Sequence, residues 1–410
     1  MTSLRKAWLV FREQGAAAVI NRALRVLFRP PAPLPGSQKI VFLVKYEDAS
    51  EVDWSVPHPA VENPIVVTKE SLTVGFIMSP PGESSGGHQN LFRFIDYLER
   101  AGHTVRIYLY SAHQPYSVRL ISEMIATSPS YPSVRATIEE YTDAGVSDDI
   151  DALFATGWET AYPSFRDSSK ARRFYFVQDY EPYFYAVGSE AALAENTYRF
   201  GFEGITAGGW LAHKLHADFG MKTASFEFGA NRELYNMTNF DKRKEVLFYA
   251  RPVTPRRGFE LGILAMEHFA KERPDYKINL AGWDVSAYDI PFPYENLKGL
   301  KIDELNEVYN RCAAGLVISL TNMSLLPLEL LSAGVIPVVN SGDNNTMVSS
   351  NTFIEFAAAS PHALAKRMIE IVDRQDADEY AARASASVEE FGWDASGKQF
   401  VSILEEAMRG

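Results

Sequence analysis

Short apolar runs alternate with amphipathic stretches along the first half of the chain. The apolar runs are residues 72–79, 103–110, 152–155 and 173–177. Between the first two runs, apolar side chains recur at helical spacing, and Gly102 then ends that stretch. The apolar face is formed by Leu91, Phe94, Ile95 and Leu98. Strand, helix and strand in this order predict a βαβ unit, to which the later runs add strands. Residues 39–46 form a further strand candidate ahead of this unit.

A second alternating series begins after the polar residues 238–245. Its predicted strands are residues 246–250, 277–281, 315–320 and 335–339, and its predicted helices are residues 258–272, 303–311 and 325–333. Strands that alternate with helices build parallel sheets with helices on both faces. The sequence therefore predicts two doubly wound α/β domains, which we place at residues 37–240 and 241–385, ahead of a last helix in 386–410.

One acid, Glu329, stands in a short predicted helix that is otherwise mostly apolar. Pro327 lies in the first turn of this helix, where its missing N–H is harmless, and Gly334 ends it. A carboxylate in the first turn is favoured by the helix dipole, so Glu329 could be an ordinary surface acid. Glu329 should also lie at the same sheet edge as Arg251 and Arg257, which follow an earlier strand of this series. It could therefore pair with them, or accept a hydrogen bond from a ligand hydroxyl.

Two loops at the carboxyl ends of predicted strands carry candidate ligand contacts, and open parallel sheets bind ligands at that edge. Arg251 and Arg257 stand on the loop between strand 246–250 and the next helix. Two forked cations and free N–H groups at a helix start suit a diphosphate, although a solvated basic loop is the alternative. Gly86 and Gly87 open the first helix and would let a ligand approach the backbone. Their loop has neither Walker A nor G-x-G-x-x-G spacing.

Acids and aromatic side chains are mixed in the segment that follows strand 173–177. This segment contains Gln178, Asp179, Tyr180, Glu181, Pro182, Tyr183, Phe184 and Tyr185. Aromatic side chains beside carboxylates are common where sugars bind, because a pyranose has apolar faces and hydroxylated edges. The alternative is an aromatic loop that packs against its own domain.

Composition narrows the class of protein. The 410 residues are 46% hydrophobic, enough for large cores, and the net charge of −12 argues against general nucleic-acid binding. The single cysteine, Cys312, can build neither a disulfide framework nor a cysteine-based zinc site. We expect it to be a small buried hydrophobe, and we expect a reducing, cytoplasmic environment for the protein.

The N-terminal segment, residues 1–29, differs from the rest of the chain in charge. It carries six arginines and lysines against one acid, Glu13, and its apolar residues recur at roughly helical spacing. No apolar run in the chain is long enough to span a membrane. A basic amphipathic helix can lie on an anionic surface, so we expect peripheral contact with the inner face of the cell membrane. A helix docked on its own domain or on a partner subunit is the alternative. A Pro-rich linker follows at residues 30–36.

From residue 72 to residue 405, the order and spacing of these motifs resemble the GT-B glycosyltransferases of family 4. The matching segments are Pro81 with Gly86-Gly87, Ala101–Val105, Phe228–Asn231 with Leu234-Tyr235, Arg251 with Arg257-Gly258, Ser324–Pro337 and Phe391–Trp393. Two segments, Val177–Tyr185 and Phe248–Pro252, resemble one subgroup more closely: the WsaF-type rhamnosyltransferases of surface-polysaccharide assembly.

This resemblance implies a GT-B fold: an acceptor-side domain, then a nucleotide-sugar-binding domain, and a last helix that crosses back to the first. It implies a retaining transfer of a sugar to a glycan or lipid-linked glycan acceptor, best matched by L-rhamnose from dTDP-L-rhamnose. In the family, the residues at Arg251 and Arg257 bind the diphosphate and stabilise the leaving group, and the acid at Glu329 binds the nucleotide's ribose. No metal ion or other cofactor is implied.

Further site residues are expected from the same resemblance. Thr321 stands where the family has an acid that contacts the donor sugar, a departure compatible with a 6-deoxy sugar. The expected donor contacts are Arg251, Arg257, Lys298, Thr321, Ser324, Leu325, Glu329, Gly86 and Gly87, and the expected acceptor contacts are Gln178, Asp179, Tyr180 and Glu181. Asp179 is also a candidate catalytic group beside the two arginines, whereas Lys298 could be only a surface lysine.

Two rival functions stay open at this point. The first is a non-catalytic glycan-binding or scaffold subunit of a polysaccharide assembly complex, which the loss of an acid at Thr321 favours. The second is a nucleotide-sugar epimerase of the same fold, which would need no acceptor.

Overall fold

The computed structural model describes residues 40–83, 85–389 and 392–410. The chain divides into two compact units, Met1–Phe42 and Leu43–Gly410, and nearly all described residues belong to the second. The predicted basic helix and linker of residues 1–36 lie outside the described residues. Within the described part of the chain, no helix is long and apolar enough to cross a membrane.

The first sheet is parallel throughout and has seven strands in the order β3-β2-β1-β4-β5-β6-β7. These strands are β1 (Thr73–Met78), β2 (Thr104–Leu109), β3 (Thr137–Glu140), β4 (Ala152–Ala155), β5 (Arg172–Val177), β6 (Glu203–Ala207) and β7 (Thr223–Phe226). The accompanying α-helices are α2 (Tyr46–Glu51), α3 (Pro59–Glu62), α4 (Gly86–Arg100), α5 (Val118–Thr127), α6 (Trp158–Arg166), α7 (Ser189–Asn196) and α8 (Gly209–Phe219). The central strands β1, β4 and β5 are buried along almost their whole length, which is why the sequence shows apolar runs there.

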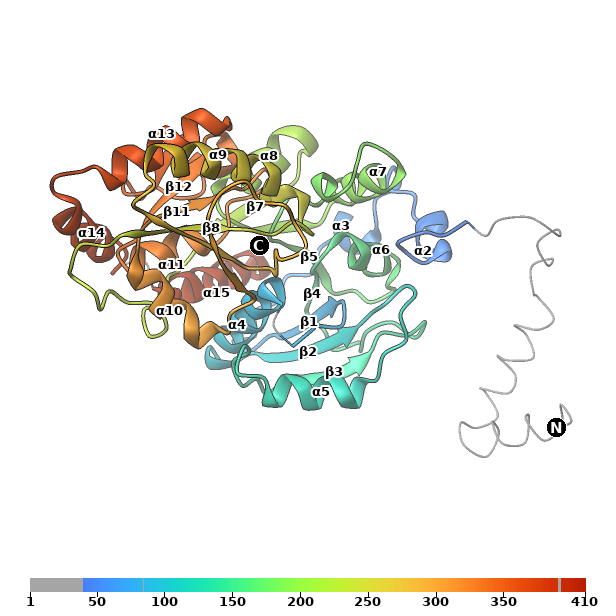
Figure 1. The fold of residues 1–410 in the computed structure, drawn as a ribbon. Coiled ribbons are helices and arrows are strands. Elements are labelled where there is room, and N and C mark those ends of the chain that lie inside the picture. Colours follow the sequence, from blue (N-terminus) through green and yellow to red (C-terminus); the bar gives the residue numbers. More distant parts are fainter. Residues whose placement is uncertain (1–39, 84, 390–391) are drawn as a thin grey trace, which may run out of the picture. The chain divides into compact units, whose positions relative to one another are not determined.

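The second sheet has six strands in the order β10-β9-β8-β11-β12-β13, and they too are all parallel. These strands are β8 (Glu245–Tyr249), β9 (Lys277–Ala281), β10 (Glu295–Lys298), β11 (Cys312–Val317), β12 (Ile336–Asn340) and β13 (Glu355–Ala357). The helices are α9 (Phe259–Glu272), α10 (Ile302–Arg311), α11 (Leu326–Ser332), α12 (Asp343–Thr346), α13 (Pro361–Val372) and α14 (Ala377–Ala386). Helices α9 and α13 lie on one side of this sheet, and α10 and α11 lie on the other (Figure 1). Two doubly wound parallel sheets confirm the predicted fold class.

The last helix, α15 (Trp393–Arg409), packs against α4 and β7 of the first sheet. The ring of Phe400, which is fully buried, lies against the rings of Phe94, Phe154 and Phe226. The C-terminal helix is therefore a part of the core beside the first sheet, although it follows the second sheet in the sequence.

The chain passes between the two sheets at two places that lie side by side. Ala230, which precedes the second sheet, forms a parallel bridge with Gly392, which follows it. A Cβ atom on Gly229 would lie 2.7 Å from the backbone nitrogen of Trp393. Only glycine fits at that point, because a real Cβ does not approach a backbone nitrogen so closely.

Two predicted strands differ from the structure. Residues 40–45 form no strand. Val44 is buried, and Asp48 of α2 binds Tyr110 and Arg166, so residues 44–48 pack on the core of the first sheet without joining its strands. The predicted strand 315–320 is β11, which begins earlier at Cys312 and ends at Val317. It ends early because Ser319 gives its N–H to the Asn340 side chain and not to a neighbouring strand (2.7 Å). Cys312 is buried, as expected, and burial raises the pKa of its thiol to about 12.

Candidate functional site

The arginine loop follows β8 at the carboxyl edge of the second sheet. A single 3₁₀ turn, Pro255–Arg257, leads into Gly258, whose φ of 57° is left-handed. A Cβ on Gly258 would lie 2.7 Å from Ile318, so this position requires glycine for both conformation and space. The turn aims Arg257 at the end of β11, where its Nη1 donates to Ser319 Oγ (2.8 Å).

Arg251 lies at the same sheet edge as Arg257. Its Nη1 donates to Tyr249 Oη over 3.2 Å, and its guanidinium carbon lies 5.9 Å from the ring centre of Trp283. Trp283 is 40% exposed at the end of β9, and sequence reasoning did not name it. An exposed indole beside an arginine offers a flat apolar face to a ligand such as a nucleobase.

Several buried polar atoms around this edge have no hydrogen-bond partner. They are Nε of Arg251, Oδ1 of Asn322 and Oγ of Ser324. Most buried polar atoms in native proteins are paired with protein or ordered water. A group of unpaired donors and acceptors at one sheet edge is therefore typical of a site that binds a polar ligand. Leu325, the other predicted donor contact here, is the N-cap of α11 and is partly buried.

Asp179 reaches this edge from the loop after β5 of the first sheet. Its Oδ2 accepts from Thr321 Oγ1 (3.0 Å), and its Oδ1 accepts from the backbone N–H of Asn322 (2.9 Å). Arg256 Nε lies 3.4 Å from the same carboxylate, whose side chain is 14% exposed. Burial raises the pKa of Asp179, while Arg257 and Arg256 act to lower it. The structure thus joins the predicted residues Asp179 and Thr321 in one contact.

Arg256 is a site residue that sequence reasoning missed. Besides its ion pair with Asp179, its guanidinium lies over the ring of Phe184, 4.2 Å from the ring centre. The signal was present in the sequence, because Arg256 stands next to Arg257 in the same loop. Three guanidinium groups, those of Arg251, Arg256 and Arg257, therefore lie along this loop.

Gln178 joins α4 to the loop after β5. Its Nε2 donates to the carbonyl oxygen of Gly87 (3.1 Å), and its Oε1 accepts from Asn90 Nδ2 (3.4 Å). A Cβ on Gly86 would meet nothing within 4 Å, so that residue borders open space. Tyr180, by contrast, is buried and stacks on Tyr198 at 5.5 Å, which is the position of a core side chain.

Glu181, in the loop after β5, and Glu159, in the first turn of α6, are two acids that lie close to Gly157. Glu181 Oε2 accepts from the N–H of Trp158 (2.6 Å) and from Tyr175 Oη (3.2 Å). The other oxygen of Glu181 and one oxygen of Glu159 lie 3.5 and 3.6 Å from the point where Gly157 would carry a Cβ. Burial, followed by the charge of Glu159, raises the pKa of Glu181 to about 8. Glu181 therefore takes up a proton at a higher pH than an exposed glutamate does.

Glu329 lies in the first turn of α11. Within the described residues, its carboxylate forms no ion pair and accepts no hydrogen bond, so it does not pair with Arg251 or Arg257. Burial raises the pKa of Glu329 to about 7, and the charge of Arg93 opposes that rise. Arg93 comes from α4, lies over the ring of Trp393 at 3.8 Å and donates to Asn90 Oδ1 (2.7 Å). Glu329 is thus a half-buried acid whose oxygens are free to accept from a ligand.

Lys298 ends the edge strand β10 in a left-handed conformation, with φ of 57°. Its side chain is 65% exposed and lies 3.8 Å from Asp284. Its carbonyl accepts from the N–H of Gly282 (2.9 Å), and its backbone bridges Trp283. Lys298 is therefore beside the exposed indole, with its ammonium turned toward an acid.

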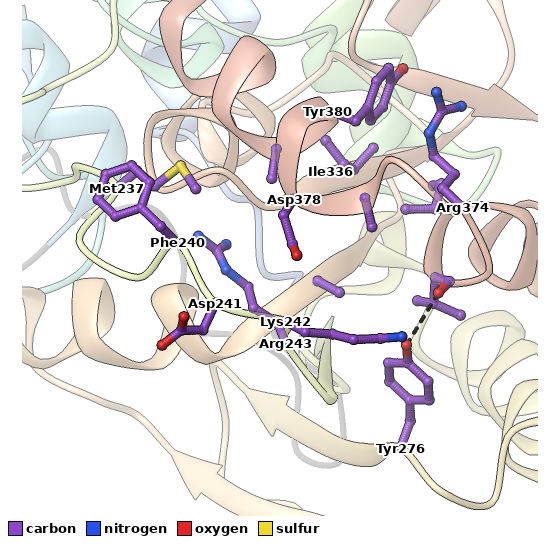
Figure 2. A pocket seen from close by; sticks show the side chains of 15 residues that line it. Met237, Phe240, Asp241, Lys242, Arg243, Tyr276, Ile336, Arg374, Asp378 and Tyr380 are labelled. Atoms are coloured by element: carbon purple, nitrogen blue, oxygen red, sulfur yellow. Dashed lines mark hydrogen bonds between the residues drawn. The ribbon is translucent and has the colours of Figure 1, made fainter.

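A separate cavity opens at the other edge of the second sheet, among residues that precede the strands. Figure 2 shows Arg243, Tyr276, Asp378 and Phe240 around it. The Arg243 guanidinium donates to three backbone carbonyl groups, so it serves the packing of this edge. This cavity lies away from the candidate site. Nowhere in the described parts of the chain do three His, Cys, Asp or Glu side chains gather to hold a metal ion.

Comparisons with known proteins agree with this arrangement. Residues 244–369 match the family model described as "WsaF, C-terminal domain". The chain is 33% identical over 273 residues to the O-antigen biosynthesis protein RfbC of Myxococcus xanthus; the match covers 64% of this chain and 21% of RfbC. The chain thus spans about a fifth of the length of the curated relative that it matches.

Solved structures show the same fold at low sequence identity. Anabaena Alr3699/HepE in complex with UDP has a TM-score of 0.62 at 14% identity, over 82% of this chain and 100% of that one. Sucrose-phosphate synthase from Thermosynechococcus elongatus has a TM-score of 0.62 at 13% identity, over 82% of this chain and 99% of that one. The comparisons agree with the predicted resemblance: the chain has the GT-B fold, and its residues 244–369 match the C-terminal domain of WsaF.

Proposed function

We propose that this chain is a glycosyltransferase that binds a nucleotide sugar on the second sheet and transfers the sugar to a glycan in surface-polysaccharide assembly. The observation that carries the proposal is the carboxyl edge of the second sheet. Three arginines and unpaired buried donors lie at this edge, and Glu329 stands in the first turn of α11, which follows β11 at the same edge. The names of the relatives support the same reading, because one is an O-antigen biosynthesis protein and another holds UDP.

The donor in this proposal is dTDP-L-rhamnose. It rests on the resemblance of residues 177–185 and 248–252 to the WsaF-type rhamnosyltransferases, together with the match of residues 244–369 to the WsaF C-terminal domain. Trp283 offers a face for the thymine base, and Glu329 accepts a hydrogen bond from a hydroxyl of the nucleotide's sugar. No metal ion is needed, because fixed guanidinium groups supply the positive charge.

Arg251 and Arg257 hold the diphosphate in this mechanism. Negative charge grows on the nucleoside diphosphate as the bond to the sugar breaks, and preorganised cations stabilise that charge without having to rearrange. Arg256 adds a third charge, which Asp179 balances in the absence of nucleotide. Transfer with retention of configuration follows from the family resemblance. In this mechanism Gln178 and Glu181 contact the acceptor.

The diphosphate role of the loop is tested by calorimetry with dTDP. Hydrogen bonds to charged groups contribute about 1.5–3 kcal/mol, so Arg257→Ala should weaken binding about ten- to a hundredfold. Arg257→Lys should keep much of the affinity, because the family has lysine at this position. Arg273→Ala is the matched control, since it removes an exposed arginine that pairs with Asp373. Equal affinity of Arg257→Ala and the control variant would remove the diphosphate from this loop.

The role of Glu329 is tested by its pH dependence. A carboxylate accepts a stronger hydrogen bond than its protonated form, and the pKa of Glu329 is about 7. Affinity for dTDP should therefore rise as the pH increases through this value. Glu329→Gln keeps the shape and cannot ionise, so its affinity should be lower above pH 7 and should lack that rise. A Glu329→Gln protein with the affinity and pH profile of the wild type would contradict the role.

Acceptor-dependent turnover separates the proposal from its rivals. A glycosyltransferase releases dTDP from dTDP-L-rhamnose only as a rhamnosyl glycan acceptor is extended. An epimerase would change the sugar without any acceptor. A scaffold subunit would bind glycan and release no dTDP. The observation that favours this rival is Thr321, which binds Asp179 at the position where the resembling family has an acid.

A further inference from the structure

Three asparagine side chains converge on the backbone carbonyl of Ser319, at the end of β11. The Nδ2 groups of Asn340, Asn344 and Asn345 donate to this one oxygen over 2.9, 3.0 and 2.9 Å. Asn340 also accepts from the N–H of Ser319 over 2.7 Å, so it holds both backbone groups of that residue. A carbonyl oxygen has two lone pairs, so three amide donors on it fix its direction more tightly than an ordinary turn does.

The asparagines are themselves held in place. Asn340 and Asn345 are buried, and Asn345 Nδ2 also donates to the carbonyl of Asn340 (2.8 Å). The backbone carbonyl of Asn344 accepts from the N–H of Met323 (3.0 Å). A Cβ on Gly342 would lie 2.5 Å from Asn344 Oδ1, so glycine at 342 leaves the room that this side chain needs.

Ser319 links the three asparagines to Arg257 through its hydroxyl group. Its hydroxyl donates to the carbonyl of Asn322 (2.5 Å), which leaves its lone pairs to accept from Arg257 Nη1 (2.8 Å). Ser319 is fully buried, so no water competes for the hydroxyl. Fixing one nitrogen of the guanidinium directs the remaining N–H groups of Arg257 to one side.

We propose that Asn340, Asn344 and Asn345 are positioning residues for Arg257: they hold Ser319 so that its hydroxyl presents the Arg257 guanidinium to the diphosphate. This inference rests on the proposed function, since it takes Arg257 to bind a diphosphate. The physical gain is preorganisation, because an arginine that is already oriented loses less side-chain freedom when the ligand arrives. None of the three asparagines touches the ligand in this proposal; they act through Ser319.

A double-mutant cycle with dTDP in calorimetry tests the inference on the full chain. The main variant is Asn344→Ala, because Asn344 is only partly buried and its loss leaves two amides on Ser319. Asn340→Ala is the stronger second variant. Asn351→Ala is the matched control: it also removes a buried amide that bonds its own neighbourhood, through Ser387 Oγ and the N–H of Phe353.

We expect Asn344→Ala to weaken dTDP binding about three- to tenfold, the range of one ordinary net hydrogen bond, and Asn340→Ala to weaken it more. In an Arg257→Ala background, Asn344→Ala should have no further effect, because the group through which it acts is gone. Asn351→Ala should leave affinity unchanged in both backgrounds.

The outcomes separate this inference from the proposed function. If Arg257→Ala weakens dTDP binding but Asn344→Ala and Asn340→Ala do not, the positioning role is wrong and the diphosphate site stands. If the asparagine variants weaken binding equally with and without Arg257, they act on the fold in general, and the positioning role is again wrong. If Arg257→Ala itself has no effect, the diphosphate site fails first.

Discussion

Replacing Asp179 with asparagine should tighten the binding of dTDP. Asp179 is an anion set against Arg256, in the loop that the diphosphate is proposed to use. Asparagine keeps an oxygen for the N–H of Asn322 and a group that can bond Thr321, so the contact between the two sheets should survive. What the variant loses is a negative charge that a diphosphate must otherwise approach.

The size of the effect follows from the geometry. Arg256 Nε lies 3.4 Å from the carboxylate, so a phosphate bound on the far side of the same guanidinium would sit about 6 Å from Asp179. Two unit charges at that distance repel by about 0.7 kcal/mol in water and about 3 kcal/mol at the effective dielectric of a protein surface. We therefore expect dTDP affinity to rise about three- to a hundredfold.

Calorimetry at low and high salt provides the assay. The gain should be larger at low ionic strength, because salt screens the repulsion that the variant removes. Asp373→Asn is the matched control, since Asp373 also pairs with an arginine, Arg273, and should leave dTDP affinity unchanged. Weaker binding by Asp179→Asn would refute the reasoning, because it would mean that Asp179 helps to hold the nucleotide and does not compete with it.

Three other predictions concern stability and location. The pKa of Glu181 is raised to about 8 in the folded protein, whereas the unfolded chain ionises it near its ordinary value of 4.5. The folded protein should therefore lose about 3–5 kcal/mol of stability as the pH rises from 4.5 to 8, and thermal melts of Glu181→Gln should lack that loss. Gly262→Ala should lower the free energy of unfolding by about 1–3 kcal/mol or more, because its Cβ would lie 1.9 Å from Phe248, whereas Gly299→Ala, with nothing within 4 Å, should not. Deleting residues 1–29 should abolish co-sedimentation with anionic liposomes and leave dTDP binding intact; equal pelleting of both proteins would refute a membrane role.

The sequence predicts the buried central strands well and the edge strands poorly. The apolar run at 152–155 is β4 itself, residue for residue, because a strand that is covered on both faces shows as an apolar run. The edge strands β3 and β10 have the sequences TIEE and ENLK and stay mostly unburied, so they leave no such run. Polar residues are common on edge strands because they discourage pairing with another chain.

Distance along the sequence also explains which parts of the candidate site could be predicted. Arg257 and Glu329 stand next to strand ends and helix starts, so the sequence alone places them at one sheet edge. The contact of Asp179 with Thr321 joins residues 142 positions apart, and no local pattern marks it. The convergence of asparagines on Ser319 is hidden for the same reason, since single asparagines in loops are ordinary turn residues.

The place of α15 sets the order in which the protein can be completed during synthesis. Phe94, Phe154 and Phe226 leave the ribosome long before Phe400, the ring that covers them. The last strand of the second sheet ends at Ala357, so this sheet can fold before Phe400 is synthesised. The aromatic side chains of the first sheet are then still exposed to solvent. The core beside the first sheet is therefore completed last, although its strands are synthesised before those of the second sheet. A nascent chain, or one truncated before α15, exposes an apolar surface that can aggregate or bind a chaperone.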